Sequence, residues 1–168
     1  MNYENPLPPD GATSFLHRSK RGELAIWLAA PTVLVFKYRG YSDAAYLPFI
    51  AMVYDRTLAN LRGRTAIFVD CELQTGYDSE FRRGLVDWLK RMLSLPSIYC
   101  LFVKSRLVAM GIALARLAMG GTAHHVEVVT TRDAYRAMLE AAVRQSLADA
   151  AIDAASDEST GRSPAGLG

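Results

Sequence analysis

The chain has 168 residues, enough for one domain with a single hydrophobic core and too few for two. Hydrophobic residues make up 51% and charged residues 21%, which is typical of a globular protein and excludes a disordered, collagen-like or coiled-coil chain. Lys and Arg number 19 against 17 Asp and Glu, a net charge of +2. A nucleic-acid partner is therefore not expected, since it would require a strongly basic face.

The first residues, MNYENPLPPDG, lack the charged and apolar regions of a signal peptide, which predicts a cytoplasmic protein. No membrane span is predicted either, because no stretch of about 18 uninterrupted apolar residues is present. Cys71 and Cys100 each lie within an apolar run. We expect both to be buried, reduced thiols without catalytic reactivity.

Both ends of the chain offer little to a hydrophobic core. Residues 1–22 contain three prolines and a basic run, which predicts a flexible arm. Residues 148–168 are rich in Ala, Ser, Asp and Gly and are expected to form a disordered tail. A single domain is therefore expected over residues 23–147.

Within that domain the hydrophobic period alternates between that of a strand and that of a helix. Two β-rich runs, 23–29 and 32–39, are split by Pro31 and predict a hairpin. The later elements are a helix from about 43 to 61, a buried strand at 65–71, a helix at 79–93 capped by Asp78, a strand at 98–104, a helix at 106–119, a strand at 125–129 and a last helix beginning after Thr130 or Thr131. The order ββαβαβαβα predicts an α/β fold with about four helices on a mostly parallel five-stranded sheet whose first strand is antiparallel.

Three acids near the expected carboxyl ends of the strands suggest one chemistry. Asp70, Glu72 and Asp78, beside Lys104, have the residue types of an Mg²⁺-dependent phosphoacceptor domain. The other loops at that edge lack the further acids and the lysine that such a domain needs, so it is the third hypothesis. We predict no resident metal or cofactor, because no glycine-rich phosphate loop is present either.

The segment 106–119, RLVAMGIALARLAM, is apolar on all sides if it is helical. A helix on a sheet needs only one apolar face, so burial on a second side is expected. That second side could pack under the amino-terminal hairpin or the last helix, form a homodimer interface or a partner groove, or line a pocket for an apolar molecule. The candidates for self-association or an apolar ligand are Val108, Met110, Ile112 and Met119.

Three stretches resemble the STAS family, the small domains named for sulfate transporters and anti-sigma-factor antagonists. They are KYRG at 37–40 followed by SDAA at 42–45, Asp70 followed eight residues later by Asp78-Ser79, and IYCLFVKS followed by RLVAMG. The pattern is most similar to the branch related to the stage-II sporulation antagonist, and distantly to CRAL-TRIO lipid carriers. Together these stretches span nearly all of residues 23–145.

The resemblance implies a non-enzymatic regulator whose loop serine is phosphorylated by a partner kinase. By position that serine is Ser79. A phosphate there would meet the free N–H groups of a helix start, with Arg82 and Arg83 one turn on. Asp78 and Glu80 flank it with like charge, and the glycine that follows in the family motif is absent here.

The leading hypothesis is therefore a cytoplasmic regulatory or scaffold protein that binds other proteins. The expected contact residues are Thr75, Tyr77, Asp78, Phe81, Arg82 and Arg83, with Tyr77 and Phe81 as aromatic anchors. The alternative is a binder of an apolar small molecule or lipid in a pocket lined by the 106–119 helix. An enzyme is not expected, because no acid, base and nucleophile are convincingly spaced.

Overall fold

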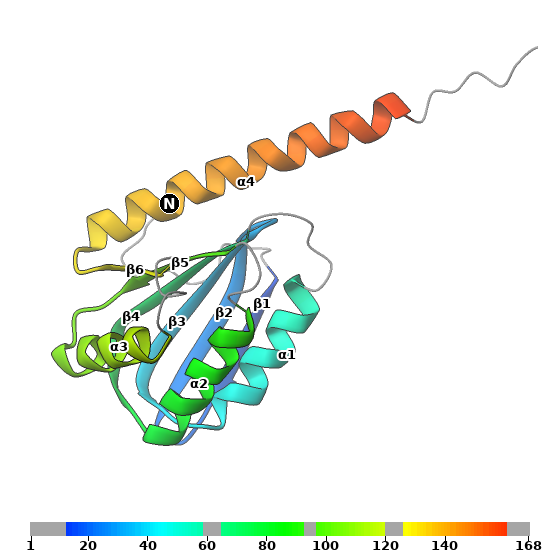
Figure 1. Cartoon of the computed structure of the whole chain (residues 1–168). Helices are drawn as coiled ribbons and strands as arrows, with labels where there is room; N and C mark the ends of the chain where they lie inside the picture. The colour runs from blue at the N-terminus through cyan, green and yellow to red at the C-terminus, as the bar shows by residue number, and fades with distance from the viewer. Residues whose placement is uncertain (1–12, 59–64, 93–96, 120–125, 161–168) are drawn as a thin grey trace, which may run out of the picture.

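A six-stranded mixed sheet forms the centre of the molecule (Figure 1). The structure is a computed structural model that describes residues 13–58, 65–92, 97–119 and 126–160. The strands lie side by side in chain order: β1 Ser14–Arg18, β2 Gly22–Ala30, β3 Val33–Ser42, β4 Thr65–Tyr77, β5 Ser97–Phe102 and β6 Val126–Val129. The pairs β1–β2 and β2–β3 are antiparallel and the other three are parallel, so the predicted α/β class with an antiparallel start is confirmed.

Four helices cover the two faces of this sheet. α1 (Tyr46–Leu58), α2 (Ser79–Met92) and α3 (Arg106–Met119) lie on one face, and α4 (Arg132–Thr160) lies on the other (Figure 1). Each of the first three joins neighbouring parallel strands that follow one another in the same direction across the sheet. Right-handed crossovers then place all three on the same side.

The alternation of side chains along the strands supplies a separate apolar core to each face. In β3, Leu34 and Phe36 pack under α1–α3, while Val33 and Val35 pack under α4. The segment 33–36 of β3 is therefore hydrophobic at every position, because both faces of the strand are buried there.

The sixth strand, β1, corrects the expectation of a flexible arm over residues 1–22. Phe15 and His17 of this strand face α1, and the His17 ring lies 5.2 Å from the ring centroids of both Tyr46 and Phe49. Burying these side chains offsets the cost of ordering the segment. Residues 1–12 of the predicted arm lie outside the described part of the chain.

The expected disordered tail also differs from the structure. α4 continues through residue 160, thirteen residues past the predicted end of the domain at 147. Its second half is rich in alanine, the residue with the highest helix propensity, so the helix continues where no core supports it. Residues 161–168 lie outside the described ranges.

The strand β4 is longer than predicted. It runs to Tyr77, so most of the expected loop between residues 70 and 79 is strand. Two irregularities in its register with β3 allow both strands to continue. The extension is held by a buried hydrogen bond of 2.8 Å from the Gln74 amide nitrogen to the Ser42 hydroxyl.

No helix within the described residues is both long enough and apolar enough to cross a bilayer.

Candidate functional site

An apolar cavity of about 110 Å³ lies between the sheet and helices α2 and α3. Its floor is formed by strands β3 to β6, and its walls by the inward faces of the two helices. The lining is almost entirely aliphatic or aromatic: Phe36, Tyr38, Ile67, Val69, Cys71, Phe81, Leu85, Val86, Trp88, Leu89, Tyr99, Leu101, Val108, Gly111, Ile112 and Val126, with Gln74, Tyr77, Arg82 and Arg116 as its polar members.

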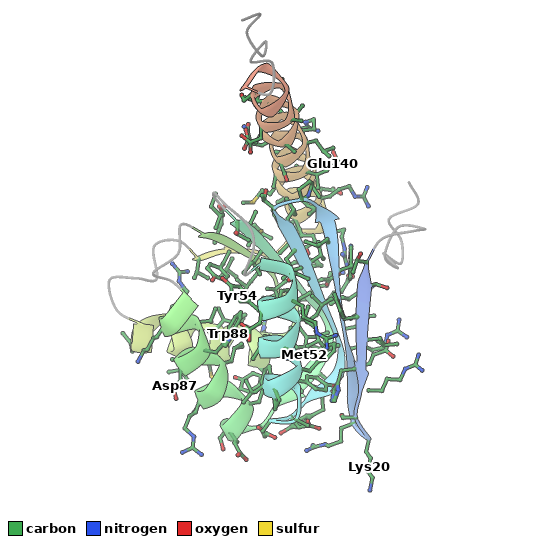
Figure 2. The ribbon with its side chains drawn as sticks, turned by 90° about the vertical axis from the view of Figure 1, so that its right-hand side faces the viewer. Lys20, Met52, Tyr54, Asp87, Trp88 and Glu140 are labelled. Atoms are coloured by element: carbon green, nitrogen blue, oxygen red, sulfur yellow. The ribbon has the colours of Figure 1, made fainter. Side chains whose placement is uncertain are left out.

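Contacts between α2 and α1 position one of these walls. α2 leans on α1 through Trp88, whose ring meets Tyr54 edge-on with the centroids 5.2 Å apart (Figure 2). Gly84 lies against Leu47 so closely that a Cβ at position 84 would overlap it. The cavity therefore lies beside a tightly packed α1–α2 pair.

The polar lining residues lie at the two ends of the cavity. Gln74, Tyr77 and Arg82 come from the end of β4 and the first turn of α2, which share one edge of the sheet. Arg116 comes from the last turn of α3, at the opposite edge. Arg82 is half-buried, whereas Arg116 is exposed. An apolar centre with a cation at each end suits a molecule with an apolar body and an anionic group.

Cys71 contributes a thiol to the cavity wall. Burial, followed by the nearby charge of Asp70, raises the pKa of this thiol far above its ordinary value. The group stays neutral at physiological pH, and a neutral thiol is a poor nucleophile. Both cysteines are free and buried, which confirms the burial expected from the sequence.

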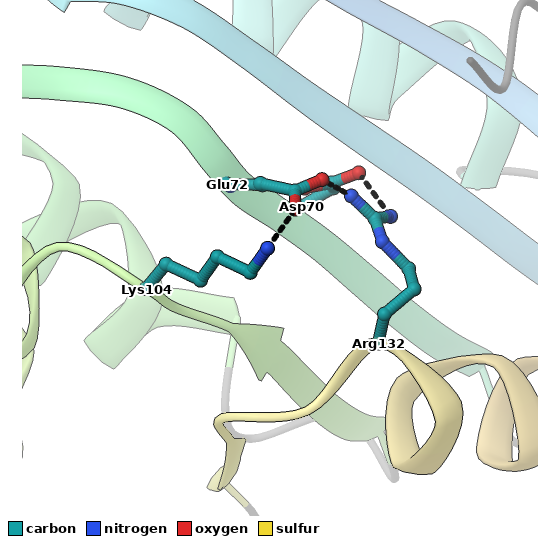
Figure 3. Close-up of polar contacts among 4 residues, drawn as sticks. All are labelled: Asp70, Glu72, Lys104 and Arg132. Carbon is teal, nitrogen blue, oxygen red and sulfur yellow. Dashed lines mark hydrogen bonds and ion pairs between the residues drawn. The ribbon is translucent and has the colours of Figure 1, made fainter. Parts of the chain in front are cut away.

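On the opposite face of the sheet, four charged side chains form one network (Figure 3). Arg132 contacts the buried Asp70 carboxylate at 2.8 Å and also pairs with Glu72, and Lys104 reaches Glu72 at 2.5 Å. No sequence pattern marked Arg132, because it follows β6 and reaches across β5 to the middle of β4.

This network does not form the Mg²⁺ site suggested by three acids. Asp70 and Glu72 are neutralised by cations, and Asp78 instead caps α2, where its carboxylate accepts a 2.6 Å hydrogen bond from the Phe81 amide. In the part of the chain that the structure describes, no group of three or more His, Cys, Asp or Glu side chains could hold a metal ion.

The residues predicted to contact a protein partner lie in different surroundings. Thr75 and Arg83 are exposed, Tyr77 and Arg82 line the cavity, and Asp78 caps α2. Ser79, the predicted phosphoacceptor, is also exposed. The expectation for Phe81 was wrong: it is only 3% exposed, because its ring packs against Tyr38 and Tyr46 in the core.

The α3 candidates divide in the same way. Val108 and Ile112 face the cavity, whereas Met110 is 57% exposed on the outer side of the helix. The side chain of Met119 lies outside the described set. The all-round apolar character of this segment therefore has two sources, a cavity wall on one side and an exposed stripe on the other.

This chain is similar to a solved protein structure. No family model matches the sequence, and no curated protein matches it. A solved structure of an uncharacterized protein of the DUF3478 family from Shewanella loihica PV-4, described as having a SpoIIAA-like fold, matches 77% of this chain and 94% of its own, with 12% identity and a TM-score of 0.49.

Proposed function

We propose that this protein binds a small molecule with an apolar body and an anionic group. The observation that supports the proposal is the cavity between the sheet and helices α2 and α3, apolar along its walls with Arg82 and Arg116 at its ends. Binding pockets for small molecules combine such apolar linings with a few placed polar groups.

The size of the cavity limits the apolar part of the ligand. Its volume of about 110 Å³ is somewhat below the roughly 150 Å³ of an engineered apolar cavity that accepts benzene. A single ring or a short alkyl chain fits, and a longer chain would extend beyond the cavity. The proposal assigns no reaction to the site.

Trp88 provides a direct readout of occupancy. It lines the cavity, whereas the second tryptophan, Trp27, lies in the core beneath α4. In a Trp27→Phe background, titration with octanoate, a medium-chain carboxylate, is expected to change the Trp88 emission in a saturable way. Absence of a saturable change would contradict the proposal.

Two variants on α3 locate the binding. Ile112→Phe extends a side chain into the cavity and is expected to abolish the octanoate response. Met110→Phe adds a comparable ring on the exposed side of the same helix and should leave the response unchanged. An equal response in both variants would place octanoate elsewhere and overturn the assignment.

A second proposal, regulated protein binding at the start of α2, is favoured by the exposure of Thr75, Ser79 and Arg83. Ser79 is the first residue of α2, where helix N–H groups would favour a phosphate. Intact-mass and peptide analysis of the protein isolated from its own cells would test this, with Ser79→Ala as control. Absence of phosphate on Ser79 under every growth condition tested would count against the phosphorylation switch.

A further inference from the structure

α3 exposes a straight stripe of large apolar side chains. Leu107, Met110, Leu114 and Leu117 are 52%, 57%, 47% and 80% exposed. Their spacing of three, four and three residues places them on one side of the helix, with the spacing of a coiled-coil seam. The charged residues of this helix are Arg106 and Arg116, both basic. A contiguous apolar stripe of this kind marks an interaction surface.

The second half of α4 is a helix without a supporting core. The part that packs on the sheet ends at Ser146, which is 2% exposed and accepts hydrogen bonds of 2.9 and 2.7 Å from the amide and hydroxyl of Thr32. Beyond it, residues 147–156 extend past the edge of the sheet (Figure 1). We call residues 147–156 the α4 extension.

The α4 extension is amphipathic, with small residues on its apolar side. At 3.6 residues per turn, Leu147, Ala151 and Ala154 fall on one side with the same seam spacing as the α3 stripe. Its two charged residues, Asp149 and Asp153, both acidic, fall on the other side. Leu147 and Ile152 are 55% and 64% exposed.

The two surfaces are complementary in shape, and the helical segments that carry them have opposite net charge. Large side chains on α3 face outward, and the alanines of the α4 extension would let a second helix approach them closely. The charge of α3 is +2 and that of the α4 extension is −2, from the residues named above. Seams of matched spacing pack at the small crossing angle of coiled coils.

Within one chain these surfaces do not meet. α3 lies on the face of the sheet opposite to α4, and the α4 extension points away from it (Figure 1). We propose that the α4 extension of one molecule packs on the α3 stripe of a second copy of this chain. Two-fold symmetry then creates two equal contacts. Each chain supplies its α3 stripe to one contact and its α4 extension to the other.

Light scattering coupled to size-exclusion chromatography of the full chain, over a range of concentrations, tests the proposed dimer. The measured mass is expected to rise from 18.5 kDa toward twice that value. Leu117→Glu on the α3 stripe and Ala151→Glu on the α4 extension should each remove the rise. Both positions are exposed and Glu is a good helix former, so neither change should prevent folding.

Two controls place the same charge elsewhere. Ala141→Glu lies on an exposed position of the packed half of α4, and Met52→Glu lies on an exposed position of α1. Both variants should dimerise as the unchanged protein does. Loss of the dimer in either control would show a charge effect unrelated to the proposed contact and overturn the proposal.

Mixing the two disrupted variants is the decisive step. A mixed pair of Leu117→Glu and Ala151→Glu chains keeps one intact contact, the unchanged α3 of one with the unchanged α4 extension of the other. The mixture should therefore associate more than either variant alone. A monomer at every concentration of the unchanged protein, a dimer that both variants retain, or a mixture no heavier than its components would overturn the proposal.

Discussion

The hydroxyl of Tyr77, the last residue of β4, donates a hydrogen bond to the backbone carbonyl oxygen of Leu107 in the first turn of α3, with 3.3 Å between the oxygens. The same hydroxyl lies directly over Gly111, one turn further along the helix. Tyr77 thereby joins the end of a strand to a wall of the cavity, and only a residue without a side chain leaves room for it at position 111.

Gly111→Ala is expected to destabilise the protein, although alanine normally favours a helix by about 0.5–1 kcal/mol over glycine. The new Cβ would overlap the Tyr77 hydroxyl, and such overpacking costs about 1–3 kcal/mol. Urea denaturation measures the change. In a Tyr77→Leu background the overlap is gone, so the same substitution should become neutral or stabilising; an equal effect in both backgrounds would disprove the coupling.

Arg132→Met should cost about 3–5 kcal/mol of unfolding free energy, because it leaves the Asp70 carboxylate, 2% exposed, without its closest cation. Lys104→Met is the matched control: its side chain is 56% exposed, and loss of an exposed ion pair costs at most about 1 kcal/mol. Denaturant unfolding of both variants checks the difference. Equal losses would mean that burial of Asp70 does not determine the energy of the network.

The Cys100 thiol should lower the stability of the protein in alkali. Burial raises its pKa from 9.0 to about 12, so the folded state binds the proton more tightly than the unfolded state. The resulting stability is fully present below pH 9.0 and is lost as the pH rises toward 12. Since burial also raises the pKa of Tyr38 and Tyr135, and tyrosines contribute their own pH dependence in alkali, the measurement is the difference between the unchanged protein and Cys100→Val. That difference should be constant below pH 9.0 and shift in favour of the variant above it; a difference independent of pH would contradict the assignment.

Arg82→Gln should weaken octanoate binding while leaving the binding of octanol, its neutral counterpart, nearly unchanged. Arg82 is the half-buried cation of the cavity lining, so its charge is less screened than that of the exposed Arg116. Trp88 fluorescence in the Trp27→Phe background measures both ligands. A loss of octanoate affinity with Arg116→Gln in place of Arg82→Gln would show that the anionic group lies at the other end of the cavity.

Asp78→Ala should destabilise the protein by about 1 kcal/mol through loss of the α2 cap. The Asp78 carboxylate accepts a 2.6 Å hydrogen bond from the Phe81 amide, one of the N–H groups that lack a partner within the helix. Asp78→Ser keeps an acceptor at that position and should lose only a fraction of this energy. Thermal unfolding of the two variants and the unchanged protein distinguishes them, and a midpoint of Asp78→Ala equal to that of the unchanged protein would show that the cap contributes no stability.

Much of the architecture could be predicted because it follows from local patterns. The β3 and β5 segments have the hydrophobic patterns of strands. Asp78 is followed by apolar residues at the spacing of a helix, which is α2. The predictions failed where a segment was judged only by the apolar side chains that it contains itself. Phe15 and His17 are two inward side chains on a short strand, too few to identify β1 without knowing that α1 packs over them.

The candidate site was predicted only in part, for a related reason. Val108 and Ile112 were identified from the excess of apolar residues in α3, and they do line the cavity. Nothing local distinguished them from Met110, since the sequence shows which side of a helix is apolar but not which of two apolar sides faces the sheet. Phe81 was proposed as a contact residue because it is aromatic, although its place in the helical period puts it inward.

The sequence by itself determined the succession of strands and helices from β2 onward, the buried state of both cysteines and the cap of α2, because each depends on residues close together in the chain. Only the tertiary structure decided the cavity, the Asp70–Arg132 pair and the separation of α3 from the α4 extension. These depend on how elements far apart in sequence pack together, and close packing fixes their relative positions through contacts such as that of Tyr77 with Gly111.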